Sequence, residues 1–140
     1  MKSLQQAIET PGETPANESV QAHRNRMKHK TYNWRPVIGS LLKTLQDHNF
    51  TLVSVDDEGE EHTLEGTPRE HRQLAKRIID SVDVSHLFVL HPSYPRHLWL
   101  FIVLGNEPHE TVSNNTDWPI LNLALEQFEN KWIDRKVPTK

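Results

Sequence analysis

Cysteine is absent from this sequence of 140 residues, and its absence removes several function classes at once. A chain without cysteine has no disulfide framework, no cysteine-ligated zinc site and no thiol nucleophile. Long apolar runs are absent too: the longest, from Leu98 to Leu104, has seven residues, whereas a membrane-spanning helix needs about 20. We therefore expect no membrane span.

Recognisable catalytic motifs are also absent. The sequence has no HExxH pair for zinc, no nucleophile-elbow serine and no glycine-rich phosphate or dinucleotide loop. Its first residues lack the continuous apolar segment of a secretory signal, because Gln5, Gln6 and Glu9 interrupt it. These absences favour a cytoplasmic, non-enzymatic protein that uses no cofactor.

Charge is unevenly distributed along the chain. Residues 1–35 hold six Lys and Arg against three acids, a net charge of +3, whereas residues 36–140 hold ten against sixteen, a net charge of −6. The first segment is also poor in apolar residues and is broken by two prolines and a glycine. We therefore predict a flexible basic arm over residues 1–34 and a single domain over residues 35–140.

Hydrophobic periodicity in the domain predicts three helices and four strands. Apolar residues recur at helical spacing after Pro36, and Thr67 followed by Pro68 and Glu70 is typical of a helix start. Short connections make both strand pairs antiparallel, so the order α-ββ-α-ββ-α predicts an α+β two-layer sandwich with a four-stranded antiparallel sheet. The predicted elements, in chain order, are a helix over 36–49, strands over 50–55 and 60–65, a helix over 68–82, strands over 86–90 and 97–104, and a helix capped by Thr116 or Asp117.

The strand predicted over residues 97–104 is apolar on both faces. Alternation places its leucines on one face and Trp99, Phe101 and Val103 on the other. If all three helices pack on one side, the other side exposes an aromatic patch, and such patches mark association surfaces. We therefore assign Trp99, Phe101 and Val103 as the candidate partner or homodimer surface. The alternative is internal cover by the N-terminal arm, a loop or the third helix.

A short basic stretch followed by two aromatic residues is a second candidate site. Lysine and arginine pair with phosphates and aromatic rings stack on bases, so this composition is typical of nucleic-acid contact. The alternative is a solubilising linker whose aromatic residues anchor the first helix on the core, and the two interpretations are compatible. The candidate contact lies within residues 23–35 and comprises Arg24, Arg26, Lys28, Lys30, Tyr32 and Trp34.

Nine histidines raise the question of a metal site, because imidazole is a common metal ligand. Those around the predicted strand ends lack the helical i, i+4 spacing that places two ligands side by side, so our first expectation is no metal site. A metal-dependent hydrolase is the alternative, with metal-activated water as the nucleophile. Its candidate residues, which would have to converge in space, are His91, His97, Glu107 and His109.

The acidic run over residues 56–61 also brings possible ligands together. It lacks the alternating Asp pattern and the distal Glu of a calcium loop, so we interpret it as a solvent-exposed hairpin turn. An acidic surface of this kind is able to recruit a basic partner.

The element order, small size and acidic body over residues 36–133 resemble the layout of the dimeric chaperones that serve bacterial type III secretion. No motif is shared, so no residue role is carried over. The resemblance implies a non-enzymatic protein whose exposed sheet face is a dimer seam or a cargo groove. Small inhibitor or immunity proteins of bacteria and phage fit the same composition. We therefore expect an accessory protein of bacterial or phage origin that binds a protein partner, with nucleic-acid association through the arm and the hydrolase as alternatives.

Overall fold

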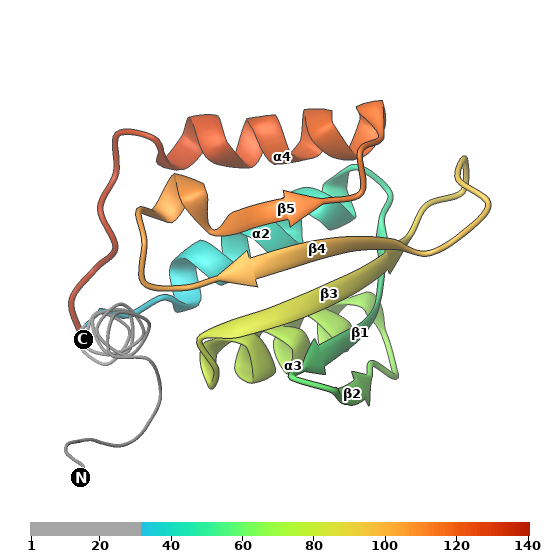
Figure 1. The fold of residues 1–140 in the computed structure, drawn as a ribbon, viewed down its shortest axis with the longest axis horizontal. Helices are drawn as coiled ribbons and strands as arrows, with labels where there is room; N and C mark the ends of the chain where they lie inside the picture. The colour runs from blue at the N-terminus through green and yellow to red at the C-terminus, as the bar shows by residue number, and fades with distance from the viewer. Residues whose placement is uncertain (1–31) are drawn as a thin grey trace, which may run out of the picture.

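The computed structural model describes residues 32–140. They form three α-helices, five strands and one short 3-10 helix (Figure 1). The predicted arm lies outside the described residues, apart from its last three positions. In chain order the elements are α2 (Arg35–Asp47), β1 (Thr51–Asp57), β2 (Glu60–Thr63), α3 (Pro68–Asp80), β3 (Val84–Leu90), β4 (Leu98–Val103), η1 (Pro108–Glu110), β5 (Val112–Asn115) and α4 (Pro119–Trp132).

The starts of the helices follow from their sequences. Proline occupies one of the first positions of α2, α3 and α4, where its missing N–H costs no hydrogen bond. At α3, Thr67 and Glu70 form a capping box, in which Glu70 N donates to Thr67 Oγ1 at 3.2 Å and Thr67 N donates to Glu70 Oε1 at 2.8 Å. The hydrogen bond from the Thr67 backbone N–H to the Glu70 carboxylate, followed by one from the Thr67 side chain, favours the charged form and lowers the pKa of Glu70. Among residues 32–140, no helix reaches the length and apolarity that crossing a bilayer requires.

The sheet has five strands, so the predicted count of four is wrong. Its order is β2-β1-β3-β4-β5 and every neighbouring pair is antiparallel, which confirms the predicted direction of both hairpins. The additional strand, β5, has the sequence VSNN, which shows no hydrophobic alternation and contains one β-branched residue. It is a strand because its backbone pairs with the edge of β4, and local sequence does not encode that pairing.

All three helices pack on one face of the sheet. Figure 1 shows α2 and α3 behind the sheet and α4 along the side where β5 lies. The opposite face, which no helix of residues 32–140 covers, is called the uncovered face below. The strand side chains under the helices are buried in one core with them; they are Leu52, Val55, Leu87, Val89, Leu98, Leu100 and Ile102.

A β-bulge in β1 decides which of its side chains reach the uncovered face. Leu52 pairs with Val89 and Ser54 pairs with Phe88, so Val53 is an extra residue between the two pairs. Regular alternation would place Leu52 and Ser54 on the same face. The bulge instead keeps Leu52 in the core and moves Ser54 to the uncovered face.

The two ends of the described chain lie together. Tyr32 forms an isolated bridge with Thr139, and Asn33 N donates to Pro138 O at 2.7 Å. Trp34, directly before α2, is 1% exposed and belongs to the core. The start of α2 is therefore fixed both by a buried ring and by the C-terminal segment.

Candidate functional site

Aromatic side chains gather on the uncovered face. The register between β3 and β4 sets His86 opposite Phe101 and Phe88 opposite Trp99, and residues opposite each other lie on the same face. The ring centroid of His86 lies 4.7 Å from that of Phe101, 6.3 Å from that of Trp99 and 6.4 Å from that of Phe88. These four residues are called the aromatic cluster below.

All three predicted surface residues, Trp99, Phe101 and Val103, lie on the uncovered face. They alternate in β4 with fully buried residues, yet they remain half-buried. The rings of the cluster shield one another, and Val103 pairs with Val84 to continue the apolar surface along the strands. An apolar surface of this kind outside the core is typical of an association site.

The strands supply the uncovered face with negative charge and with no positive charge. None of the five strands contains a lysine or an arginine. Asp56 lies on this face because it pairs with His86, and Glu61 lies there because it pairs with Asp56. In the part of the chain that the structure describes, neither carboxylate forms an ion pair with a lysine or an arginine.

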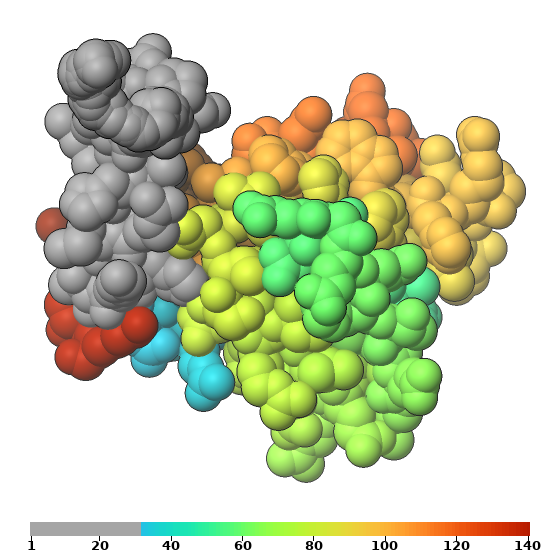
Figure 2. Space-filling model, turned by 60° about the horizontal axis from the view of Figure 1, so that its bottom comes forward, coloured from blue at the N-terminus to red at the C-terminus, as the bar shows by residue number. Residues whose placement is uncertain are grey.

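A hollow of about 280 Å³ lies between the aromatic cluster and the β1–β2 hairpin. Figure 2 shows this hairpin, in green, at the surface beside β3, in yellow-green. Ser54 is 1% exposed, and its hydroxyl has no hydrogen-bond partner among the described residues. We call this space the acidic hollow; its lining residues are Ser54, Asp56, Gly59, Glu61, Phe88 and His97.

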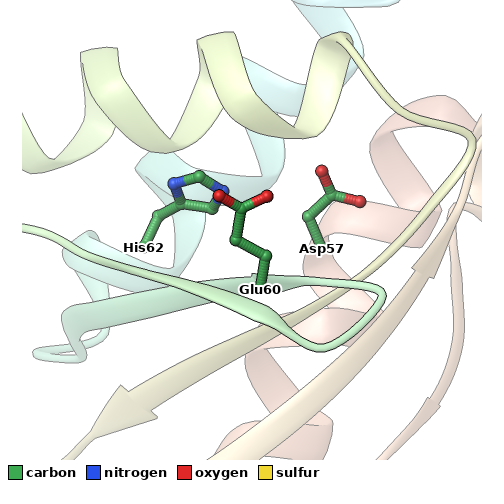
Figure 3. Close-up of side chains that lie close together, drawn as sticks. All are labelled: Asp57, Glu60 and His62. Atoms are coloured by element: carbon green, nitrogen blue, oxygen red, sulfur yellow. The ribbon is translucent and has the colours of Figure 1, made fainter.

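A second group of polar side chains lies on the other side of the same hairpin. Asp57 and Glu60 are opposite each other across the turn, and His62 follows on the same side of β2 (Figure 3). Their ligand atoms all lie within 4.8 Å of one another, which no other group of three His, Asp or Glu in residues 32–140 achieves. The spacing suits a divalent ion, but exposed acidic groups often have such a spacing without binding one.

The four residues of the predicted metal cluster are not brought together. His91 packs against the rings of Phe50 and Trp118, and its Nε2 lies 3.1 Å from the backbone oxygen of His48. These contacts are those of a residue that stabilises the fold. His97 directly precedes β4, whereas Glu107 and His109 follow it, so the whole strand lies between them in the chain. No three of these four residues belong to a group of closely spaced metal ligands within residues 32–140.

The predicted nucleic-acid contact is described only at Tyr32 and Trp34. Trp34 is 1% exposed and is therefore unavailable for stacking on a base, and Tyr32 packs against the core. Both positions agree with the alternative interpretation, in which these rings anchor the first helix. The remaining candidate residues lie outside the described residues and stay a prediction: Arg24, Arg26, Lys28 and Lys30.

The sequence does not identify the whole site. Alternation in β3 with the apolar Leu87 and Val89 is a pattern that could have predicted His86 and Phe88 to lie on the face opposite the core. The acidic hollow had no local signal, since it depends on the bulge in β1 and on the register between three strands.

The uncovered face thus combines an aromatic cluster, an acidic hollow and strands without basic residues. Comparison with protein-family models, with curated proteins and with solved structures finds no match for this chain.

Proposed function

We propose that this chain is a non-enzymatic binding protein that acts through protein–protein association, with the uncovered face as its contact surface. The observation that carries the proposal is the aromatic cluster, which lies on the neighbouring strands β3 and β4 outside the core. Aromatic residues are enriched at protein interfaces, and a few of them usually supply most of the binding energy. A half-buried aromatic surface on a sheet has that composition.

Charge favours a protein over a nucleic acid as the occupant of this face. Platforms for single-stranded nucleic acid combine aromatic rings with a positively charged groove. Here the strands carry no lysine or arginine, and Asp56 and Glu61 would repel phosphates. Nucleic-acid contact through residues 23–31 would be a separate activity of the chain.

The test places a photo-crosslinking amino acid at position 101 of the full chain, in the cell that naturally makes it. The matched control places it at Leu123, which is 50% exposed on α4. We expect a discrete product from position 101 alone, which mass spectrometry identifies as a second copy of the chain or as a different protein. Equal products from both positions, or none from position 101, would overturn the proposal.

The identified protein then provides a quantitative test with purified components. Phe101→Ala should weaken its binding at least about tenfold, because truncation of a central interface aromatic commonly costs about 2 kcal/mol or more. Leu123→Ala should leave the affinity unchanged. Isothermal titration calorimetry measures both variants.

A further inference from the structure

We infer that the acidic hollow receives the guanidinium group of an arginine side chain from the bound protein. The inference rests on the proposed function, because it takes the uncovered face as the contact surface. It adds the chemistry of the partner, which is a polypeptide segment with an accessible arginine beside apolar residues. A pair of carboxylates, a buried hydroxyl and an aromatic wall carry the argument.

The two carboxylates of the hollow form an uncompensated pair. Asp56 and Glu61 are direct cross-strand partners, and like charges in this position destabilise a sheet. Asp56 Oδ1 accepts a hydrogen bond from Gly59 N at 2.9 Å, and within residues 32–140 no cationic side chain pairs with either residue. A cation between them would replace one repulsive contact by two charge-assisted hydrogen bonds.

Ser54 indicates a ligand independently of these charges. It lines the hollow and is 1% exposed, and its hydroxyl has no partner among the described residues. Buried polar groups nearly always have a hydrogen-bond partner, so an unpaired one beside a hollow calls for an explanation. A guanidinium N–H could donate to this hydroxyl while other N–H groups pair with the carboxylates. The bulge at Val53 supports this assignment, because bulges often re-aim side chains at binding sites.

The wall formed by Phe88 favours guanidinium over other cations. A cation over an aromatic face is attracted by the ring, and the planar guanidinium also stacks on it. Its five N–H donors suit acceptors spread around a hollow of about 280 Å³, whereas lysine presents a compact point charge. A bare metal ion suits the hollow less well, because Asp56 and Glu61 belong to no group of three closely spaced ligands.

The test titrates the isotope-labelled full chain with the peptide acetyl-Val-Arg-Val-amide and follows the backbone amide signals by NMR. The control peptide carries citrulline in place of arginine, which keeps the length and shape of the side chain and removes its charge. We expect the arginine peptide to shift the signals of Ser54, Gly59 and Phe88. The citrulline peptide should bind at least about tenfold more weakly, since it cannot form charge-assisted hydrogen bonds.

Variants of the hairpin assign the binding to the hollow. Asp56→Asn keeps an oxygen for the Gly59 N–H, and Glu61→Gln changes an exposed residue, so both should fold. Each should weaken binding of the arginine peptide about tenfold. Glu60→Gln is the matched control, because it removes the same charge from the adjacent residue of β2 on the opposite side, and it should change the affinity by less than about twofold.

Three outcomes would overturn the inference. Equal affinity for the two peptides, or equal loss in Glu60→Gln, would reduce the effect to general attraction by an acidic surface. The third outcome is that the full chain does not bind the peptide, but that changing Arg24 and Arg26 to Gln shifts the amide signals of the residues that line the hollow. The hollow would then bind the chain's own basic segment. None of these outcomes alters the cross-linking result at position 101, which tests the aromatic surface by itself.

Discussion

The two faces of the sheet differ although the same strands build both. In β4, Leu100 is 0% exposed beneath the helices, whereas the next residue, Phe101, is half-buried on a face without a helix. Both side chains are large and apolar, so hydrophobicity does not distinguish them. The two residues differ in what packs against them, because helices cover Leu100 and no helix of residues 32–140 covers Phe101. Alternate positions of a single strand therefore serve stability on one side and leave apolar surface outside the core on the other.

The largest expected effect separates the two faces by their contribution to stability. Leu100→Ala should lower the free energy of unfolding by about 2–5 kcal/mol, because it leaves a cavity in a closed core. Phe101→Ala should lower the free energy of unfolding by only about 1 kcal/mol, because the half-buried ring of Phe101 removes less apolar surface from water on folding than a fully buried side chain does. Urea denaturation followed by circular dichroism measures both values.

A volume-conserving change completes this comparison. Leu100→Met should cost less than about 1.5 kcal/mol, which would show that the loss in Leu100→Ala comes from the cavity. If Phe101→Ala cost as much as Leu100→Ala, Phe101 would behave as a core residue. The contrast between the faces would then disappear.

Two buried serines provide a second, smaller comparison. Ser85 faces the core opposite Ile102 and is 2% exposed, and its hydroxyl, like that of Ser54, has no partner among the described residues. Ser85→Ala and Ser54→Ala should each raise the free energy of unfolding by up to about 1 kcal/mol, because each removes an unpaired buried polar group. Only Ser54→Ala should also weaken binding of the arginine peptide.

Thermal unfolding and the peptide titration check the serine pair. A loss of stability in both variants would mean that these hydroxyls do have partners. The buried hydroxyl would then no longer indicate a ligand in the hollow. A matching loss of peptide affinity in Ser85→Ala would instead show that the effect is not local to the uncovered face.

Most of the fold follows from local patterns in the sequence. The capping box at Thr67 and the alternation over β4 each carry their own signal, and the structure has both elements close to the predicted bounds. β5 carries no such signal. The predicted cap of the last helix, Thr116 or Asp117, is wrong. The helix α4 begins at Pro119 with Trp118 as its N-cap residue, and Thr116 Oγ1 instead accepts a hydrogen bond from Trp99 N at 2.9 Å. Contacts distant in sequence therefore decide the region between β4 and α4.

The candidate site also has one part that the sequence predicts and one part that it does not. Alternation is sufficient to place Trp99 and Phe101 opposite the core, so the aromatic side could be predicted from β4 alone. The acidic hollow could not be predicted, because unbroken alternation from Leu52 would send Ser54 and Asp56 into the core. The bulge that prevents this depends on pairing with β3, which local sequence does not reveal.

The smallest expected effect on stability concerns Glu129 of α4, whose side chain is only partly buried. Burial raises the pKa of its carboxyl; His109 opposes the rise and Glu126 adds to it. The folded state therefore holds this proton more tightly than the unfolded state, and stability is lost as pH rises from the unfolded value near 4.5 through the folded pKa. Glu129→Gln should raise the free energy of unfolding by less than about 1 kcal/mol at about pH 8, well above the unfolded value, and leave it unchanged at about pH 3. Thermal unfolding of both proteins at the two pH values measures the difference. If Glu129→Gln were instead less stable than the unchanged protein at the higher pH, the contacts of the charged carboxylate would contribute more free energy than its partial burial costs.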